Sequence, residues 1–173
     1  RRTVSMKRLC HQGQEFTVDA SQNPETTDSK FDLPQTDTPL AGLRLLLAED
    51  CADQGRMYLR FLQSAGAEVT LECNGESTVD SVRKAPSMFD AVVMDFQMPE
   101  MDGLESTTQL RELGYGGAII AATAFGSEEL KRNWFQAGCD AYLIKPLKTH
   151  ELIRAVLQHA TAAEKQVEVP SGT

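Results

Sequence analysis

The 173-residue chain has little cysteine, little basic charge and no long apolar segment. Its four cysteines form no Cys-x-x-Cys pair and no metal-ligand spacing, which excludes a disulfide framework and favours free thiols in a reducing cytoplasm. The formal net charge of −8 and the lack of a basic cluster argue against a nucleic-acid partner. The apolar run at residues 118–125 is far too short to span a membrane, and no apolar segment follows the basic N-terminus to make a signal peptide.

The length and the 41% apolar content of the chain predict one domain with a substantial core. Residues 1–41 are rich in small polar residues and proline, so we expect a linker or a remnant of a preceding domain that is largely disordered. Residues 164–173 are expected to form a C-terminal tail. Because the sequence starts at Arg1 and not at a methionine, we expect a fragment of a longer protein.

Short apolar runs alternate with helical patterns between residues 42 and 163. The runs predict strands at 43–48, 67–71, 91–94, 118–122 and 141–144. Polar cap or turn signals predict where the five helices begin, at Asp53, Asn74–Gly75, Asp102–Gly103, Ser127 and Thr149. In the first helix the expected apolar positions are Met57, Phe61, Leu62 and Ala65. The alternation predicts an α/β fold, a flavodoxin-like doubly wound sheet of five parallel strands in the order 2-1-3-4-5.

Polar side chains stand where four of these strands end, namely Glu49 and Asp50, Asp95, Thr123, and Lys145. The carboxyl ends of parallel strands share one edge of the sheet, so we expect these side chains to meet. Three carboxylates gathered in one place repel one another unless a cation neutralises them, and hard oxygen ligands suit Mg²⁺. A carboxylate, a hydroxyl, an ammonium group and Mg²⁺ around one point predict a phosphoryl-transfer site in which Asp95 is the nucleophile.

Four segments together resemble the receiver domain of response regulators in two-component signalling: residues 48–50, 94–103, 122–124 and 142–146. The resemblance covers residues 42–163. It implies that Asp95 is the phosphoacceptor and is loaded from a phosphohistidine donor. It also implies a bound Mg²⁺, for which Mn²⁺ can substitute, held by Asp50, Asp95, the backbone carbonyl of Gln97 and, through water, Glu49.

The resemblance further assigns the residues that respond to the phosphoryl group. Thr123 and Lys145 would contact the phosphoryl oxygens, and the Lys145–Pro146 peptide bond would be cis. Thr123 and Tyr142 would form a switch that changes the face made by the fourth helix and the fifth strand, where a downstream protein would bind. Trp134 and Phe135 on that helix are expected to serve the core or an interface.

The sequences of these segments resemble, in particular, those of the C-terminal receiver of a hybrid sensor histidine kinase. Such a domain is a phosphoaccepting switch that hydrolyses its own phosphoryl group, and it is not a dedicated enzyme, although the parent protein can be a membrane-associated kinase. We therefore expect a cytoplasmic segment with no membrane contact of its own. A stand-alone response regulator is the alternative, and the oligomeric state, including a dimer, stays open.

Other uses of the same fold are less consistent with the residues. A phosphatase of the haloacid-dehalogenase type needs a second Asp two residues after the nucleophile, where this chain has Gln97. A flavin mononucleotide carrier needs a hydroxyl-rich phosphate loop after the first strand, where Glu49 and Asp50 would repel phosphate. A degenerate receiver that serves only as a scaffold would lack a site residue, and none is missing.

Overall fold

The structure is a computed structural model that describes residues 38–164. The expectations for residues 1–37 and for the tail at 165–173 lie outside the described residues. Strands and helices alternate along the described part in the order β1 (Arg44–Ala48), α1 (Ala52–Ser64), β2 (Glu68–Glu72), α2 (Gly75–Lys84), β3 (Ala91–Asp95), α3 (Gly103–Glu112), β4 (Ala118–Thr123), α4 (Glu128–Ala137), β5 (Ala141–Ile144) and α5 (Thr149–Glu164).

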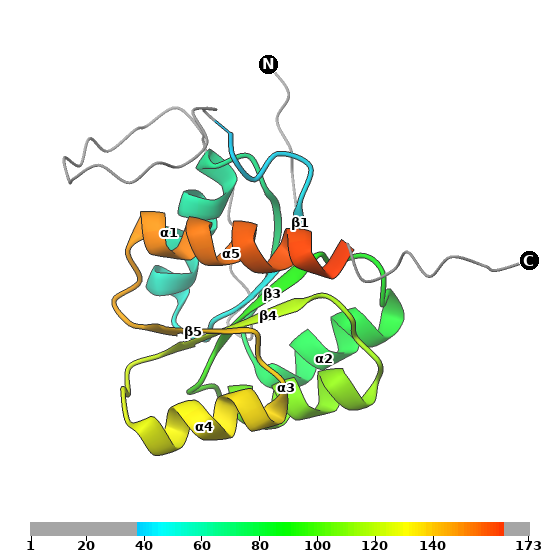
Figure 1. The fold of residues 1–173 in the computed structure, drawn as a ribbon, viewed down its shortest axis with the longest axis vertical. Helices are drawn as coiled ribbons and strands as arrows, with labels where there is room; N and C mark the ends of the chain where they lie inside the picture. Colours follow the sequence, from blue (N-terminus) through cyan, green and yellow to red (C-terminus); the bar gives the residue numbers. More distant parts are fainter. Residues whose placement is uncertain (1–37, 165–173) are drawn as a thin grey trace, which may run out of the picture. The chain divides into compact units, whose positions relative to one another are not determined.

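The five strands form one parallel sheet in the order β2-β1-β3-β4-β5, which confirms the predicted topology. Helices α1 and α5 lie on one face of the sheet, and α2, α3 and α4 lie on the other (Figure 1). Every residue of β3 and β4 is buried, as expected for strands that are covered on both faces and therefore have no polar alternation.

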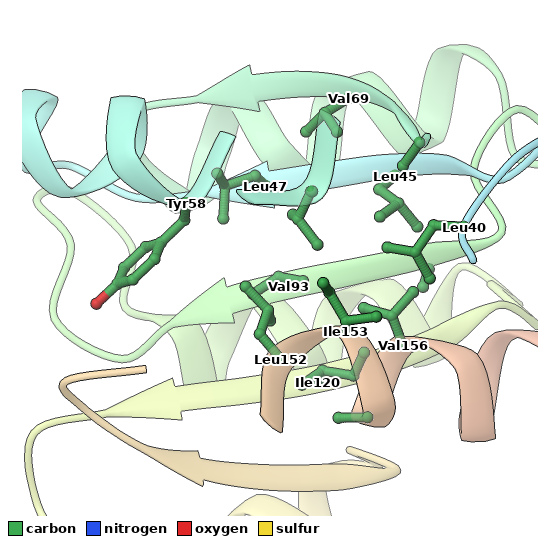
Figure 2. Packing of buried hydrophobic residues seen from close by; sticks show 14 of the residues in the cluster. Leu40, Leu45, Leu47, Tyr58, Val69, Val93, Ile120, Leu152, Ile153 and Val156 are labelled. Atoms are coloured by element: carbon green, nitrogen blue, oxygen red, sulfur yellow. The ribbon is translucent and has the colours of Figure 1, made fainter. Parts of the chain in front are cut away.

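Each face of the sheet packs against its own hydrophobic cluster. Figure 2 shows the cluster beneath α1 and α5, where aliphatic side chains of β1, β3 and β4 meet those of α5. The second cluster fills the space between the sheet and α2, α3 and α4, and it contains the fully buried Trp134. Both clusters hold the carboxyl ends of the strands in fixed relative positions, which matters because the polar residues follow those ends.

The beginning of α1 differs from the prediction. Cys51 occupies the N-cap position without a side-chain cap, and Asp53 lies in the first turn, where it pairs with Arg56. The inward face also differs, because Tyr58 is buried whereas Met57 is 38% exposed. Of the predicted apolar positions, Leu62 and Ala65 are buried and Phe61 is partly buried against the same cluster, so only Met57 is wrong. Tyr58 takes its place in the core, because an aromatic ring with one polar tip can still be buried.

The chain just before β1 belongs to the core. Leu40 is fully buried, and its backbone N–H donates to the carbonyl of Ala65 at 2.7 Å. The expected domain start at residue 42 therefore leaves out one core side chain. Within residues 38–164, the helices are all too short or too polar to cross a membrane.

Candidate functional site

The register of the sheet places the expected site residues at one level. Asp95 at the end of β3 is opposite Ala122 in β4, so Thr123 follows one residue further on. The backbone N–H of Lys145, just past β5, donates to the carbonyl of Thr123 at 2.7 Å. Glu49 follows Ala48, the last residue of β1. All of these side chains consequently start from the carboxyl edge of the sheet.

Three carboxylates meet at this edge. Glu49, Asp50 and Asp95 each offer an oxygen, and these oxygens all lie within 4.8 Å of one another. Glu49 and Asp95 are only 3% and 6% exposed, whereas Asp50 faces solvent. The cluster therefore has a buried floor and an open side from which a small ligand can approach.

Lys145 supplies the positive charge next to the two buried carboxylates, Glu49 and Asp95. Its Nζ lies 2.7 Å from Oε2 of Glu49 and 2.9 Å from Oδ1 of Asp95, and it lies 6.0 Å above the centre of the Tyr58 ring. The Lys145–Pro146 peptide bond is cis. One ammonium group thus bridges two of the three carboxylates and leaves the cluster with a net negative charge.

Burial dominates the acid–base behaviour of these groups. Removal from water raises the pKa of Glu49 and of Asp95, and the hydrogen bonds from Lys145 offset only part of that rise. For Lys145, burial alone would lower the pKa, but the hydrogen bonds to Glu49 and Asp95 outweigh it and raise the pKa. The lysine therefore stays charged, while its hydrogen bonds do not fully offset the cost of burying the negative charges of Glu49 and Asp95.

The two oxygens of Asp95 have different surroundings. Oδ1 accepts a hydrogen bond from the backbone N–H of Phe96 at 2.8 Å and also pairs with Lys145. Within residues 38–164, Oδ2 has no hydrogen-bond donor. Gly103 packs against the Asp95 carbonyl so closely that an added Cβ would overlap it, so the loop must fold tightly here. Asp95 thus presents one held oxygen and one oxygen open to chemistry.

Within the described residues, neither of the two expected switch residues forms a hydrogen bond with Asp95. Thr123 is fully buried, and its Oγ1 accepts a hydrogen bond from the N–H of Phe125 at 3.1 Å. Tyr142 donates its hydroxyl to the carbonyl of the same residue, Phe125. Both residues therefore hold the backbone of the loop between β4 and α4.

Some groups at the site were not predicted from the sequence. Tyr58 lies at the end of the cluster to which the strand arrows point, with its hydroxyl directed away from the aliphatic side chains (Figure 2). Its spacing of four residues from the buried Leu62 is a helical signal that could have revealed it. The hydrogen bonds that Phe96 and Phe125 make here use backbone groups and leave no signature in residue type. Gln97 lies in the exposed loop after Asp95, and the metal role of its carbonyl stays a prediction.

Fold and site together define a doubly wound α/β domain with a cluster of three carboxylates and one buried lysine at the carboxyl edge of its sheet. Residues 45–157 match the family described as the response regulator receiver domain. The chain belongs to this family.

Its curated relatives include histidine kinases. The chain is 31% identical over 150 residues to the osmosensing histidine protein kinase SLN1 of Saccharomyces cerevisiae, covering 82% of this chain and 12% of that protein. It is 33% identical over 138 residues to probable histidine kinase 2 of Oryza sativa, covering 70% of this chain and 13% of the relative. The chain thus spans about an eighth of the length of these relatives, and it is homologous to the receiver domains of hybrid histidine kinases.

Solved structures agree. The receiver domain of the sensor histidine kinase PA1611 from Pseudomonas aeruginosa is 35% identical, with a TM-score of 0.64 over 70% of this chain and 99% of that one. That structure has a magnesium ion in its active site cleft. The signal receiver domain of a LuxO repressor protein from Vibrio parahaemolyticus is 25% identical, with a TM-score of 0.68 over 74% of this chain and 98% of that one.

Proposed function

We propose that this domain accepts a phosphoryl group on Asp95 from a phosphohistidine donor, in an Mg²⁺-dependent step, and later releases it by hydrolysis. The observation that carries the proposal is the arrangement of the Asp95 carboxylate: it is buried beside Lys145, its Oδ1 is held, and its Oδ2 accepts no hydrogen bond from the described residues. A held carboxylate with a free oxygen is a positioned nucleophile.

The reaction that this geometry supports is an in-line transfer between two protein side chains. The free oxygen of Asp95 attacks the phosphorus of the donor, an O–P bond forms, and the P–N bond to the donor imidazole breaks. The Lys145 ammonium lies beside the reacting carboxylate and stabilises negative charge on the transferred phosphoryl oxygens. Attack by water on the acyl phosphate returns inorganic phosphate and the free carboxylate.

The residues present also fit a divalent cation. Three carboxylates within 4.8 Å of one another share a single lysine, and burial leaves two of them poorly compensated. Asp50, Asp95 and the carbonyl of Gln97 would hold the ion, with Glu49 reaching it through water, and Mn²⁺ could replace Mg²⁺. When bound, the ion would neutralise phosphoryl charge during transfer. The magnesium in the PA1611 receiver supports the assignment.

The output would arise at the face formed by α4 and β5. Thr123 and Tyr142 hold the same loop residue, Phe125, from two sides. A phosphoryl group that draws the Thr123 hydroxyl inward would free that loop and allow the Tyr142 ring to move. The resulting shift between two packings would be sensed by a downstream protein on α4 and β5.

The parent of this segment would be a hybrid sensor histidine kinase, as its relatives suggest, with a stand-alone response regulator as the alternative. The free thiols of Cys51, Cys73 and Cys139 fit a reducing compartment such as the cytoplasm. The gene sequence upstream of Arg1 would distinguish the two parents, because only a hybrid kinase encodes a kinase core there.

The central test is to treat the protein with acetyl phosphate and Mg²⁺ and to map the adduct by mass spectrometry. We expect a single phosphorylated residue, Asp95, and none in Asp95→Asn. Asp140→Asn is the matched control, because Asp140 is paired with Arg111 and lies away from the carboxyl edge. An adduct that persists at unchanged yield in Asp95→Asn would overturn the assignment.

A further inference from the structure

Three aromatic rings connect the phosphoacceptor loop to α4. The ring of Phe96 meets the ring of Trp134 edge-on, with 6.0 Å between the ring centroids and 65° between the planes. Phe96 also meets Phe125, at 6.5 Å and 87°. These are favoured aromatic geometries. The residue directly after Asp95 therefore lies between α4 on one side and the loop that precedes α4 on the other.

The backbone of Phe96, together with Lys145, orients the Asp95 carboxylate. Its N–H is shared between Oδ1 of Asp95, at 2.8 Å, and the carbonyl of Ala122, at 3.0 Å. Its carbonyl accepts the N–H of Gly103 at 2.9 Å. The Phe96 N–H can thus donate more strongly either to the Asp95 carboxylate or to the carbonyl of Ala122 in β4. A small displacement of the Phe96 ring would change that balance and the orientation of the carboxylate.

Trp134, on α4, packs against the Phe96 ring and lies close to Gly103. It is fully buried, and a Cβ added to Gly103 would lie 2.9 Å from its Cη2. Its indole N–H has no hydrogen-bond partner; among buried side-chain polar atoms of residues 38–160, only the Thr107 hydroxyl shares that condition. An unpaired buried donor is costly, and a phenylalanine or leucine would avoid that cost. The large ring is therefore held where it gains no hydrogen bond, against the loop that carries Asp95.

We propose that Trp134 is a positioning residue for the phosphoacceptor: through the Phe96 ring it fixes the Asp95 carboxylate and couples the position of α4 to phosphoryl transfer. The inference rests on the proposed function of Asp95. The coupling is reciprocal, so phosphorylation changes the surroundings of Trp134, and a partner that moves α4 changes the reactivity of Asp95. This route uses the ring contact between Trp134 and Phe96, and it meets the hydrogen bonds of Thr123 and Tyr142 at Phe125.

The first experiment uses Trp134 as its own reporter, because it is the only tryptophan in the chain. Beryllofluoride with Mg²⁺ is added as a phosphoryl mimic, and tryptophan emission is recorded alongside a binding isotherm from calorimetry. We expect a change in emission that saturates with binding. In Phe96→Leu the emission change should be largely lost even at saturation, whereas Phe135→Leu, the neighbouring exposed position on α4, should keep it.

The second experiment measures phosphorylation rates with acetyl phosphate. Trp134→Leu should slow phosphorylation of Asp95 by about twofold to tenfold, the range that corresponds to one aromatic pair. Trp134→Phe keeps a ring against Phe96 and should stay within about twofold of the wild type. Leu110→Ala, in the same cluster, controls for a general loss of core packing. If Trp134→Leu does not fold, Phe96→Leu gives the same comparison.

The outcomes separate this inference from the function on which it rests. A wild-type protein that neither binds beryllofluoride nor accepts phosphate at Asp95 would contradict the proposed function. A wild-type protein that does both, with an emission change unaltered by Phe96→Leu or with equal slowing by Leu110→Ala and Trp134→Leu, would contradict only the role of Trp134.

Discussion

At the scale of single residues, the site holds more negative charge than its one lysine neutralises. Lys145 pairs with both Glu49 and Asp95, yet burial raises the pKa of both carboxyls. The folded state thus favours the protonated form of each. Without a cation, these carboxylates cost stability, and a divalent ion or a phosphoryl mimic with its ion relieves that cost.

Asp95→Asn should therefore stabilise the metal-free protein at neutral pH. We expect a gain of about 0.5–2 kcal/mol in the free energy of unfolding, the usual range for a stabilising substitution. The measurement is urea unfolding in the presence of a chelator. Asp90→Asn is the control and should give no gain, because Asp90 accepts hydrogen bonds from Arg44 that the substitution weakens.

The pH dependence of this gain has a definite sign. A carboxyl with a raised pKa contributes stability that is fully present below its ordinary value, 3.8 for Asp95, and that is lost as the pH rises through the folded-state value. The advantage of Asp95→Asn should therefore shrink as the pH falls from neutral toward 3.8, because the wild-type carboxyl takes up its proton. Saturating Mg²⁺ at neutral pH should also reduce the difference in the free energy of unfolding between Asp95→Asn and the wild type. If the stability advantage of Asp95→Asn increased at acidic pH, the raised pKa of Asp95 would be contradicted.

The charged residues of the site could be predicted because each one directly follows an apolar run, and parallel strands bring such positions to one edge. The sequence could not show which oxygen of Asp95 is held by hydrogen bonds and which one is open to reaction. That difference depends on the backbone N–H of Phe96, and every residue except proline has such a group.

At the scale of helices and strands, the switch proposed for Thr123 and Tyr142 makes a testable prediction. NMR spectra with and without beryllofluoride should differ most between Thr123 and Lys145. Thr123→Ala should reduce those differences while Asp95 still accepts phosphate, because the Thr123 hydroxyl would no longer couple the phosphoryl group to Phe125. Shifts confined to the loops around Asp50 and Asp95 would show that the site binds phosphate without switching this face.

The opposite end of α4 is held by Arg111 of α3. The guanidinium donates to the carbonyls of Gly138 at 2.9 Å, Tyr115 at 2.6 Å and Gly117 at 2.8 Å, and to Oδ2 of Asp140 at 2.7 Å. Four acceptors from two separate turns thus depend on one side chain. The turn after α4 is held by this side chain, whereas the loop before α4 is held by the hydrogen bonds and ring contacts of Phe125 and by the cap of Ser127.

Arg111→Ala should lower the free energy of unfolding by about 1.5–3 kcal/mol, the scale of hydrogen bonds to a charged group. Arg111→Lys should recover less than half of the loss, because an ammonium group lacks the planar array of donors. Urea unfolding measures both, and beryllofluoride affinity should change less than twofold since Arg111 lies away from the site. A large loss of affinity with unchanged stability would mean that this turn acts on Asp95.

Helix boundaries were predicted well where a cap or a left-handed glycine marks them. Asn74, Asp102 and Ser127 cap their helices with side-chain hydrogen bonds, and Gly138 ends α4 in the left-handed region. Helix α1 was predicted less well, because its N-cap residue Cys51 makes no side-chain cap and so leaves no signal.

At the scale of the whole domain, the sheet order followed from the alternation of strands and helices together with right-handed crossovers. The start of the core did not follow, since Leu40 is a single apolar residue in a polar stretch. It packs in the cluster between the sheet and helices α1 and α5, and a contact between elements far apart in the sequence leaves no local pattern.

Leu40→Ala should lower the free energy of unfolding by about 2–4 kcal/mol, as for other buried leucines. The exposed Leu113 is the control, and Leu113→Ala should cost less than about 0.5 kcal/mol. A chain that begins at residue 38 should likewise be more stable than one that begins at residue 42. Equal stability of these two chains would show that Leu40 is dispensable.

Leu40 precedes β1, so it lies at the amino edge of the sheet, opposite the edge that carries Asp95. Helix α5 runs back from β5 toward the same amino edge, where Val156 approaches Leu40 (Figure 2). Both ends of the described part therefore leave the domain on the side away from the site. Polypeptide attached at either end, or at both, would therefore not obstruct Asp95. Such freedom of attachment suits a unit that matches only about an eighth of the length of its relatives.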